Sequence, residues 1–243
     1  MKTITILTLF PSFFDGFLNS SIIKRAISKN AVKFKIINIR DYSLDKNHRV
    51  DDRPTGGGAG LIMRLEPLMD CLNKNNLMGT HKILMSPKGH TYTQKDAIRL
   101  SKSIDDITIV CGHYEGIDSR FEDYVDEQIS IGDYILTGGE IGSLVLSDSI
   151  TRLLPGAITE LSTEEESFSD GLLEYPQYTY PKVYDGKEIP EILFDGDHDK
   201  VRKWRLKQAL KLTLEKRPDL LAHRKFTKEE LLILKEIKIE SNK

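Results

Sequence analysis

The first 154 residues alternate between short apolar runs and stretches that have the spacing of amphipathic helices. The strand-like runs cover 3–10, 32–39, 82–86 and 106–111, and the helical spacing covers 13–29, 65–74, 93–103 and 140–153. Such alternation is typical of an α/β domain with a mostly parallel sheet. We therefore expect the N-terminal part of the chain to have an α/β fold.

The pattern changes after residue 156. The stretch 157–170 is polar and acidic with little apolar periodicity, which is typical of a flexible linker. Helices are predicted at about 199–216 and 227–239, and the second begins at Thr227 with Glu230 three residues later, a capping box. The predicted organisation is an α/β domain over 1–156, a linker over 157–170 and a small, mainly helical domain over 171–243.

Composition places the chain among ordinary soluble globular proteins, with 39% hydrophobic and 30% charged residues in a length of 243. No apolar run approaches the roughly 20 residues that span a bilayer, and the chain opens on a strand-like run rather than a signal peptide. Cys71 and Cys111 are isolated thiols, which we expect to be buried small hydrophobes in a reducing compartment. These features predict a cytoplasmic protein without a membrane partner.

The net charge of −2 argues against a uniformly basic nucleic-acid-binding protein, but the charge is unevenly distributed. Acidic residues outnumber basic ones from Glu160 to Asp199, and the balance reverses from Lys200 to Lys228. The basic segment fits a locally RNA-contacting surface, and it equally fits the solvated face of a helix.

Two glycine-punctuated strings, Val110–Asp118 and Ser130–Glu140, each follow an apolar run that is predicted to be a buried strand. Glycine at such positions either allows a tight turn or lets the backbone approach a ligand closely. Strand ends in an open α/β sheet commonly bind ligands, so the two strings predict one shared pocket. The G-x-G-x-x-G and G-x-x-x-x-G-K-[ST] fingerprints are absent, which argues against a dinucleotide site or a P-loop.

Several strings of the chain resemble the bacterial tRNA (guanine-N1)-methyltransferase family of the SPOUT superfamily, in the order that this family shows. They comprise Cys111-Gly112-X-Tyr114-Glu115-Gly116-Ile117-Asp118, Ser130–Glu140, Leu9–Pro11, Asp51–Gly58, Ser86–Gly89, Gly171–Pro176 and Trp204–Gln208. The resemblance covers nearly the whole chain. It implies a SPOUT-type parallel sheet with a deep trefoil knot, which neither periodicity nor composition announces.

The resemblance also implies the activity: methylation, from S-adenosylmethionine, of N1 of the guanosine at position 37 of tRNA, 3′ to the anticodon. The implied partners are the tRNA anticodon stem-loop and a second copy of the chain, because the family builds each site from two subunits. A Mg²⁺ requirement is implied too, although the sequence shows no dedicated cluster of metal ligands. The alternatives are a SPOUT enzyme with another RNA target and a catalytically impaired, RNA-binding homologue.

By this resemblance, the cofactor lies among three loops, where backbone groups read the adenine and small residues admit a bent cofactor. The predicted cofactor residues are Met85, Ser86, Pro87, Gly112, Tyr114, Glu115, Gly116, Ile131, Gly132, Asp133, Tyr134, Ile135, Leu136, Gly138 and Gly139.

Methylation at guanine N1 needs a base for the N1 proton and a donor for the charge that builds on O6. The resemblance implies that Arg152, before the linker, is the donor. It places the base just before Ser167 and Phe168, where this chain has Glu166 and the family usually has Asp. A longer carboxylate shifts the reacting oxygen, so Glu166 is our first choice and Asp170 the alternative.

The predicted substrate contacts lie in two places. Asp51, Arg53, Gly57 and Gly58 belong to a segment that is either a plain surface loop or, by resemblance, a wall near the target base. Arg202, Arg205 and Lys207 lie on the predicted basic helix and are candidate phosphate contacts.

Overall fold

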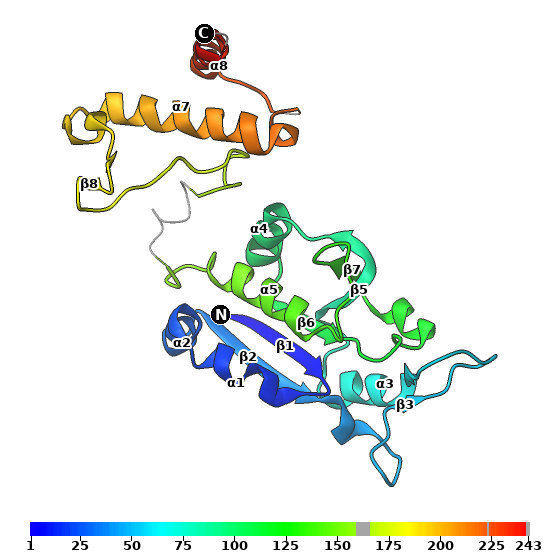
Figure 1. Cartoon of the computed structure of the whole chain (residues 1–243). Helices are drawn as coiled ribbons and strands as arrows, with labels where there is room; N and C mark the ends of the chain where they lie inside the picture. The colour runs from blue at the N-terminus through cyan, green and yellow to red at the C-terminus, as the bar shows by residue number, and fades with distance from the viewer. Residues whose placement is uncertain (159–165, 223, 242–243) are drawn as a thin grey trace. The chain divides into compact units, whose positions relative to one another are not determined.

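The apolar runs of the N-terminal part form five strands of one sheet, in the order β2-β1-β6-β5-β7. The strands are β1 (Lys2–Thr8), β2 (Val32–Asn38), β5 (His81–Thr91), β6 (Asp106–Cys111) and β7 (Glu127–Ser130). Every neighbouring pair is parallel. The prediction of an α/β domain with a parallel sheet is confirmed (Figure 1).

This computed structural model describes residues 1–158, 166–222 and 224–241. The chain divides into two compact units, Met1–Glu160 and Leu161–Lys243. The central part of the predicted linker, including Glu164 and Glu165, lies outside the described residues.

Three of the four helical patterns of the N-terminal unit appear as predicted, in α3 (Leu65–Lys74), α4 (Gln94–Ser103) and α5 (Glu140–Thr151). The fourth pattern, over 13–29, is helical too but is divided into shorter elements. That stretch forms η1 (Pro11–Phe14), α1 (Asp15–Leu18) and α2 (Ser21–Ser28). Asn19 and Ser20 hydrogen-bond through their side chains to the carbonyls of Asp15 and Gly16, and Ser20 then turns extended. Such side chains compete with the helical backbone and end α1 there.

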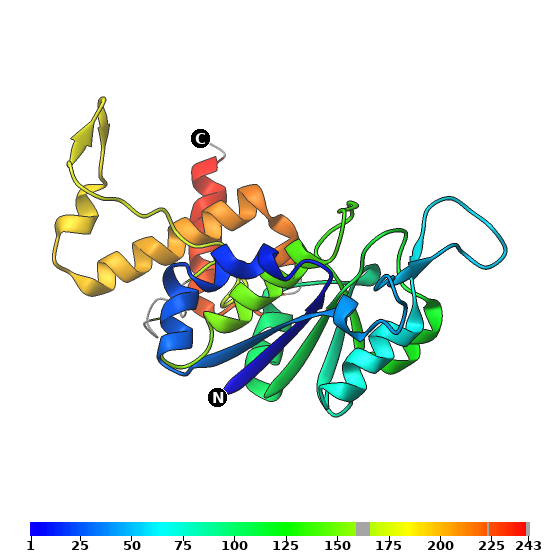
Figure 2. The ribbon, with the colours of Figure 1, turned by 90° about the horizontal axis from the view of Figure 1, so that it is seen from below.

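Helices cover both faces of the sheet (Figure 2), as buried parallel sheets require. On one face Ile4 and Ile6 pack with Leu146 and Ile150 of α5. On the other face Leu7 packs in a second cluster with residues of α3. Cys71 and Cys111 are both fully buried, and burial raises the pKa of Cys71 to about 12. The prediction that both thiols act as buried small hydrophobes is confirmed.

Strand β5 is longer than predicted, and its irregularity shapes the loop region. Its register with β7 shifts between Met85 and His90, both of which pair with Ile129. The segment 86–89 therefore bulges out of a continuing strand instead of ending it. The sequence pattern also missed β3 (Asp51–Asp52), β4 (Ile62–Met63), η2 (Ile39–Tyr42) and η3 (Ser119–Tyr124).

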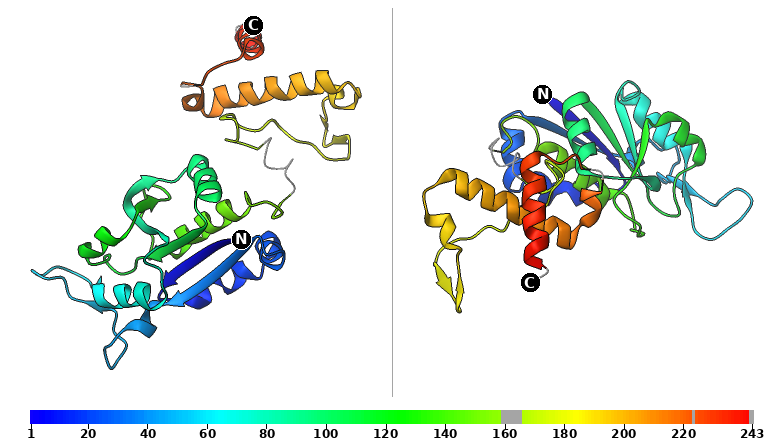
Figure 3. Two further views of the ribbon diagram at one scale, coloured as in Figure 1. Left: turned by 180° about the vertical axis from the view of Figure 1, so that it is seen from behind. Right: turned by 90° about the horizontal axis from the view of Figure 1, so that it is seen from above.

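The C-terminal unit is built on two helices, α7 (His198–Lys216) and α8 (Lys228–Ser241). Its small core brings Leu172 against Leu210, Ile233 and Ile237. The shorter elements are β8 (Val183–Tyr184), β9 (Lys187–Glu188), η4 (Glu191–Phe194) and η5 (Pro218–Leu221). The β8–β9 hairpin, yellow in Figure 3, projects away from α7.

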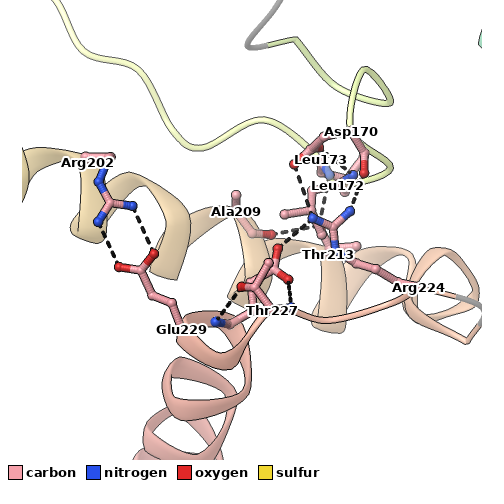
Figure 4. Close-up of polar contacts among 10 residues, drawn as sticks. Asp170, Leu172, Leu173, Arg202, Ala209, Thr213, Arg224, Thr227 and Glu229 are labelled. Atoms are coloured by element: carbon pink, nitrogen blue, oxygen red, sulfur yellow. Dashed lines mark hydrogen bonds and ion pairs between the residues drawn. The ribbon is translucent and has the colours of Figure 1, made fainter.

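A polar cluster joins α8 to the segment before α7 (Figure 4). Arg224 contacts the backbone carbonyl and, at 3.3 Å, the carboxylate of Asp170, and it bonds Glu230 Oε1 at 2.6 Å. Glu230 also accepts from the Thr227 N–H at 2.7 Å, and its own N–H donates to Thr227 Oγ1. The predicted capping box is confirmed, and its carboxylate has a second role as the partner of a half-buried guanidinium.

The Glu230 cluster makes the stability of the C-terminal unit depend on pH. Burial alone would raise the pKa of Glu230, but hydrogen bonds from Arg224 and Thr227 lower it below its ordinary value of 4.5. A carboxyl with a lowered folded-state pKa contributes stability above its ordinary pKa and loses it as pH falls further. We expect Glu230→Gln to cost about 1–3 kcal/mol at pH 7, and this difference from the parent to shrink below about pH 4.5.

Trp204 is the only tryptophan and lies in α7, so its fluorescence during urea unfolding reports this unit within the full chain. A cost for Glu230→Gln that is equal at pH 7 and pH 3.5 would contradict the charge-based account.

Candidate functional site

The N-terminal unit holds a cavity of about 560 Å³ at the carboxyl ends of β5, β6 and β7. Its lining comes mainly from the bulge of β5 and from the loops after β6 and β7, together with Ile62 of β4, Ser119 and Glu122 of η3, and Gly142 in the first turn of α5. A volume of this size is typical of a small-molecule pocket, and the position is the one where open α/β sheets bind ligands.

The loop after β6 owes its shape to backbone conformations that side chains rarely adopt. Tyr114 has φ of 59° and Gly116 has φ of 132°. Glu115 N donates to the carbonyl of Leu61, and the Gly116 carbonyl accepts from Met63 N, so the β4 segment holds this loop in place. The Tyr114 hydroxyl, at the cavity, accepts a hydrogen bond from Arg40 at 3.2 Å.

The loop after β7 folds back on itself at Gly132. Its φ of 149° lets the Tyr134 ring lie where a side chain at Gly132 would be, and Tyr134 donates its hydroxyl to the carbonyl of Ile131 at 3.1 Å. Tyr134 is thus a half-exposed wall of the cavity and not a core aromatic. Farther on, Gly139 N donates to the Gly112 carbonyl at 2.8 Å, which joins this loop to the end of β6.

The bulge of β5 supplies the third wall. Lys88 Nζ contacts Glu122 Oε1 at 2.9 Å, and Gln128 donates to the other oxygen of Glu122 at 3.0 Å. The hydrogen bond from Lys88, and to a smaller extent the one from Gln128, lowers the pKa of Glu122. A Lys–Glu pair therefore lies at the edge of the cavity, where both residues line it.

Fourteen of the fifteen predicted cofactor residues line this cavity, and Asp133 does not. His113, Lys88 and Thr137 also line the cavity; they lie inside the strings that carry the family resemblance but are not among the predicted cofactor residues, whereas Glu122 was missed altogether. The Nδ1 atom of His113 is buried and has no hydrogen-bond partner among the described residues. The position of His113 inside the first glycine string could have identified it. No comparable signal marks Glu122, which reaches the cavity only because η3 folds beside β5.

The two predicted catalytic residues belong to different units. Arg152 is half-buried and caps the C-terminus of α5, where its backbone N–H donates a hydrogen bond to the Asp148 carbonyl at 3.0 Å. Glu166 is half-buried in the C-terminal unit and lines a smaller hollow of about 330 Å³, together with residues of α7 and of the segment that precedes it. Asp170 lines the same hollow, but its carboxylate accepts from Leu172 N at 3.0 Å and pairs with Arg224.

The predicted substrate loop joins β3 to β4 and projects from the N-terminal unit as the long light-blue loop in Figure 2. Asp51 begins this ribbon, and Arg53 is exposed on it. Gly57 and Gly58 have φ of 88° and 135°, and nothing lies within 4 Å of a side chain at Gly57. The loop has the room and backbone freedom to approach a ligand closely.

The predicted phosphate contacts of α7 are engaged within the C-terminal unit. Arg202 bonds Glu229 at 2.8 Å and Asp199 at 3.1 Å, and Lys207 bonds Glu240 at 2.7 Å. The Arg205 guanidinium lies 4.8 Å from the centre of the Tyr175 ring. These contacts hold the unit together, and the carboxylates compensate much of the positive charge of α7.

Within the described residues, no group of three or more His, Cys, Asp or Glu side chains is arranged to hold a metal ion. No helix in the described ranges combines the length and the hydropathy of a membrane span.

Comparison with known proteins identifies the family. A sequence model of the family described as tRNA (Guanine-1)-methyltransferase TrmD matches residues 1–223. The chain is 49% identical to a tRNA (guanine-N(1)-)-methyltransferase of Aster yellows witches'-broom phytoplasma, over 99% of both chains. It is 51% identical to the protein of that name from Carboxydothermus hydrogenoformans, over 95% of this chain and 92% of the relative. The identity is 47% to that of Halalkalibacterium halodurans, over 99% of both chains. The chain therefore belongs to the tRNA (guanine-1)-methyltransferase family.

Proposed function

We propose that this protein transfers a methyl group from S-adenosylmethionine to N1 of the guanosine at position 37 of tRNA. The observation that carries the proposal is the convergence of three of the family strings, Ser86–Gly89, Cys111–Asp118 and Ser130–Glu140, on one cavity formed by the β5 bulge and the loops after β6 and β7. The proposal also places the protein in the cytoplasm, where such a tRNA is available.

The cavity fits the cofactor in size and in chemistry. Loops rich in glycine expose backbone N–H and carbonyl groups to it, which suits recognition of an adenine edge. Glu115 supplies negative charge for the amino group and the sulfonium, and His113 Nδ1 is a buried polar atom without a hydrogen-bond partner among the described residues. When bound, S-adenosylmethionine supplies an electrophilic methyl group on its sulfonium sulfur.

In the proposed reaction, the guanine N1–H proton passes to the Glu166 carboxylate as the N1–methyl bond forms and the sulfur–methyl bond breaks. The Arg152 guanidinium donates hydrogen bonds to O6, where negative charge builds up. The contacts of Asp170 support this assignment of the base. Its carboxylate is engaged by Arg224 and by Leu172 N, as expected for a structural role.

The proposal includes the trefoil knot and the homodimer. The backbone at Gly138 and Gly139 packs closely against Cys111 and Met85, between the ends of β6 and β5. This close packing supports a knot in which the chain passes through at this point. Exposed apolar side chains near the cavity support a subunit interface. Ile141 and Val145 are 44% and 41% exposed on α5, and Phe10 and Phe13 are also exposed. In the dimer, the cofactor cavity and Arg152 of one subunit would work with Glu166 of the other.

We further propose that the β3–β4 loop grips the anticodon stem-loop beside the target base, with Arg53 on a phosphate. Any Mg²⁺ requirement would then be met jointly by protein carboxylates and RNA phosphates.

The test is transfer of a labelled methyl group to an unmodified tRNA with guanosine at position 37, beside the same tRNA with adenosine there. Transfer to the guanosine tRNA alone is the expected result, with the product identified as 1-methylguanosine by nuclease digestion and mass spectrometry. Label at a ribose 2′-hydroxyl or at another base would overturn the proposal in favour of another SPOUT target. Cofactor binding without any transfer would indicate a catalytically impaired homologue.

A further inference from the structure

The segment from Gly16 to Arg40 contains six Lys and Arg residues and no Asp or Glu, in a protein whose net charge is −2. Five of these cations lie on α2, on the turn after it and on β2, and all five are exposed: Lys24, Arg25, Lys29, Lys33 and Lys35. We call them the α2–β2 basic surface.

None of the five forms an ion pair with a carboxylate of the described residues, and the one side-chain hydrogen bond that they form within these residues runs from Lys29 Nζ to the Gly156 carbonyl. Several cations in the first half of α7 differ in this respect. Arg202, Lys203 and Lys207 each face at least one carboxylate. An ion-paired cation attracts a phosphate weakly, because its partner cancels much of its field. The α2–β2 basic surface is therefore a cluster of positive charge without ion pairs, whereas the sequence pattern had pointed to α7.

The fold explains why these side chains face outward. Ile23 and Ala26 bury one face of α2, so Lys24, Arg25 and Lys29 lie on the other. Strand β2 is the edge of the sheet and pairs only with β1. Protection of an edge strand would account for Lys33 and Lys35. It does not account for the three cations of α2 and its following turn, which lie on no strand.

We propose that the α2–β2 basic surface binds the phosphate backbone of the tRNA outside the anticodon loop, an inference that rests on the proposed function. Strand β2 lies three strand positions from β5 in the sheet, and its lysines lie near the end of the strand that is opposite to the cavity. The spacing between strands and the length of β2 together place the α2–β2 basic surface about 20 Å from the cavity. An anticodon loop that enters the cavity cannot reach that far at the same time. We therefore assign the contact to the tRNA body beyond the anticodon stem-loop, where the phosphate backbone is bound through its charge and without base readout.

The test compares the triple variant Lys24→Gln, Lys33→Gln and Lys35→Gln with a control of equal charge change, Lys95→Gln, Lys102→Gln and Lys187→Gln. The control lysines are also exposed and have no ion pair among the described residues. Dissociation constants are measured for full-length tRNA, for an isolated anticodon stem-loop and for S-adenosylmethionine, across a range of salt concentrations.

For the α2–β2 variant we expect at least tenfold weaker binding of full-length tRNA and a salt slope that is less steep by about two to three. Stem-loop and cofactor binding should stay unchanged. Equal losses in the control variant, or equal losses on the stem-loop, would overturn the inference. The inference would also be overturned if the α2–β2 variant bound full-length tRNA as the parent does but no longer bound vesicles of anionic lipid, because the surface would then bind a membrane and not tRNA. If the parent methylates tRNA and the variant binds it normally, only this inference fails; if the parent methylates no tRNA, the proposed function fails.

Discussion

Replacement of Glu166 by Gln is expected to lower kcat for tRNA methylation by about 10²–10⁴-fold, the range that loss of a general acid–base group commonly causes. Gln has nearly the size and shape of Glu but cannot take the N1 proton. Affinity for S-adenosylmethionine should stay within about twofold, because the proposed role of Glu166 is to take a proton from the guanine and not to hold the cofactor. Single-turnover methylation and calorimetry of cofactor binding measure the two quantities separately.

Two variants serve as controls for this result. Glu166→Asp restores the residue that the family usually carries at this position, so we expect it to keep activity within about tenfold of the parent. Asp170→Asn removes one of the two carboxylates that pair with Arg224 and should lower the stability of the C-terminal unit by about 1 kcal/mol, with kcat nearly unchanged. Full activity in Glu166→Gln together with loss of kcat in Asp170→Asn would transfer the role of base to Asp170.

The fold class could be predicted from the sequence because buried parallel strands leave long apolar runs, as in Ile4–Leu7 and Ile107–Cys111. Two-residue strands such as β3 and β4 leave no such pattern, and their pairing depends on contacts with the loop after β6. The break between α1 and α2 was hidden for another reason. The apolar periodicity continues through it, and only the side-chain hydrogen bonds of Asn19 and Ser20 end the helix.

The cofactor cavity was predictable to the extent that its walls come from glycine strings at strand ends. Lys88 and Glu122 show the limit of that approach, since their pairing joins residues from two elements that have no common motif. The basic helix shows a second limit. The cluster of Lys and Arg in α7 is visible in the sequence, but the carboxylates of α8 that compensate it, such as Glu229 and Glu240, become neighbours only in the fold.

The second large effect is expected at Gly139, whose backbone lies between the ends of β5 and β6. A Cβ added there would lie 2.8 Å from Cys111 Cα, 3.0 Å from Met85 Cβ and 3.1 Å from Gly112 N. These atoms belong to the backbone or to its first side-chain carbon, so no rotamer change relieves the contact. Overpacking of this kind costs about 1–3 kcal/mol.

We expect Gly139→Ala to lose about 2–3 kcal/mol of unfolding free energy and at least tenfold in affinity for S-adenosylmethionine, because Met85 and Gly112 line the cavity and must move to admit the methyl group. Urea unfolding and calorimetry measure the two losses. Gly79→Ala is the matched control, since nothing lies within 4 Å of a Cβ at Gly79, and it should leave both quantities unchanged. Cofactor affinity in Gly139→Ala equal to that of the parent would mean that the cofactor does not depend on the Gly139 wall. The proposed cavity would then be the wrong site, because a ligand held between the ends of β5 and β6 cannot be indifferent to their separation.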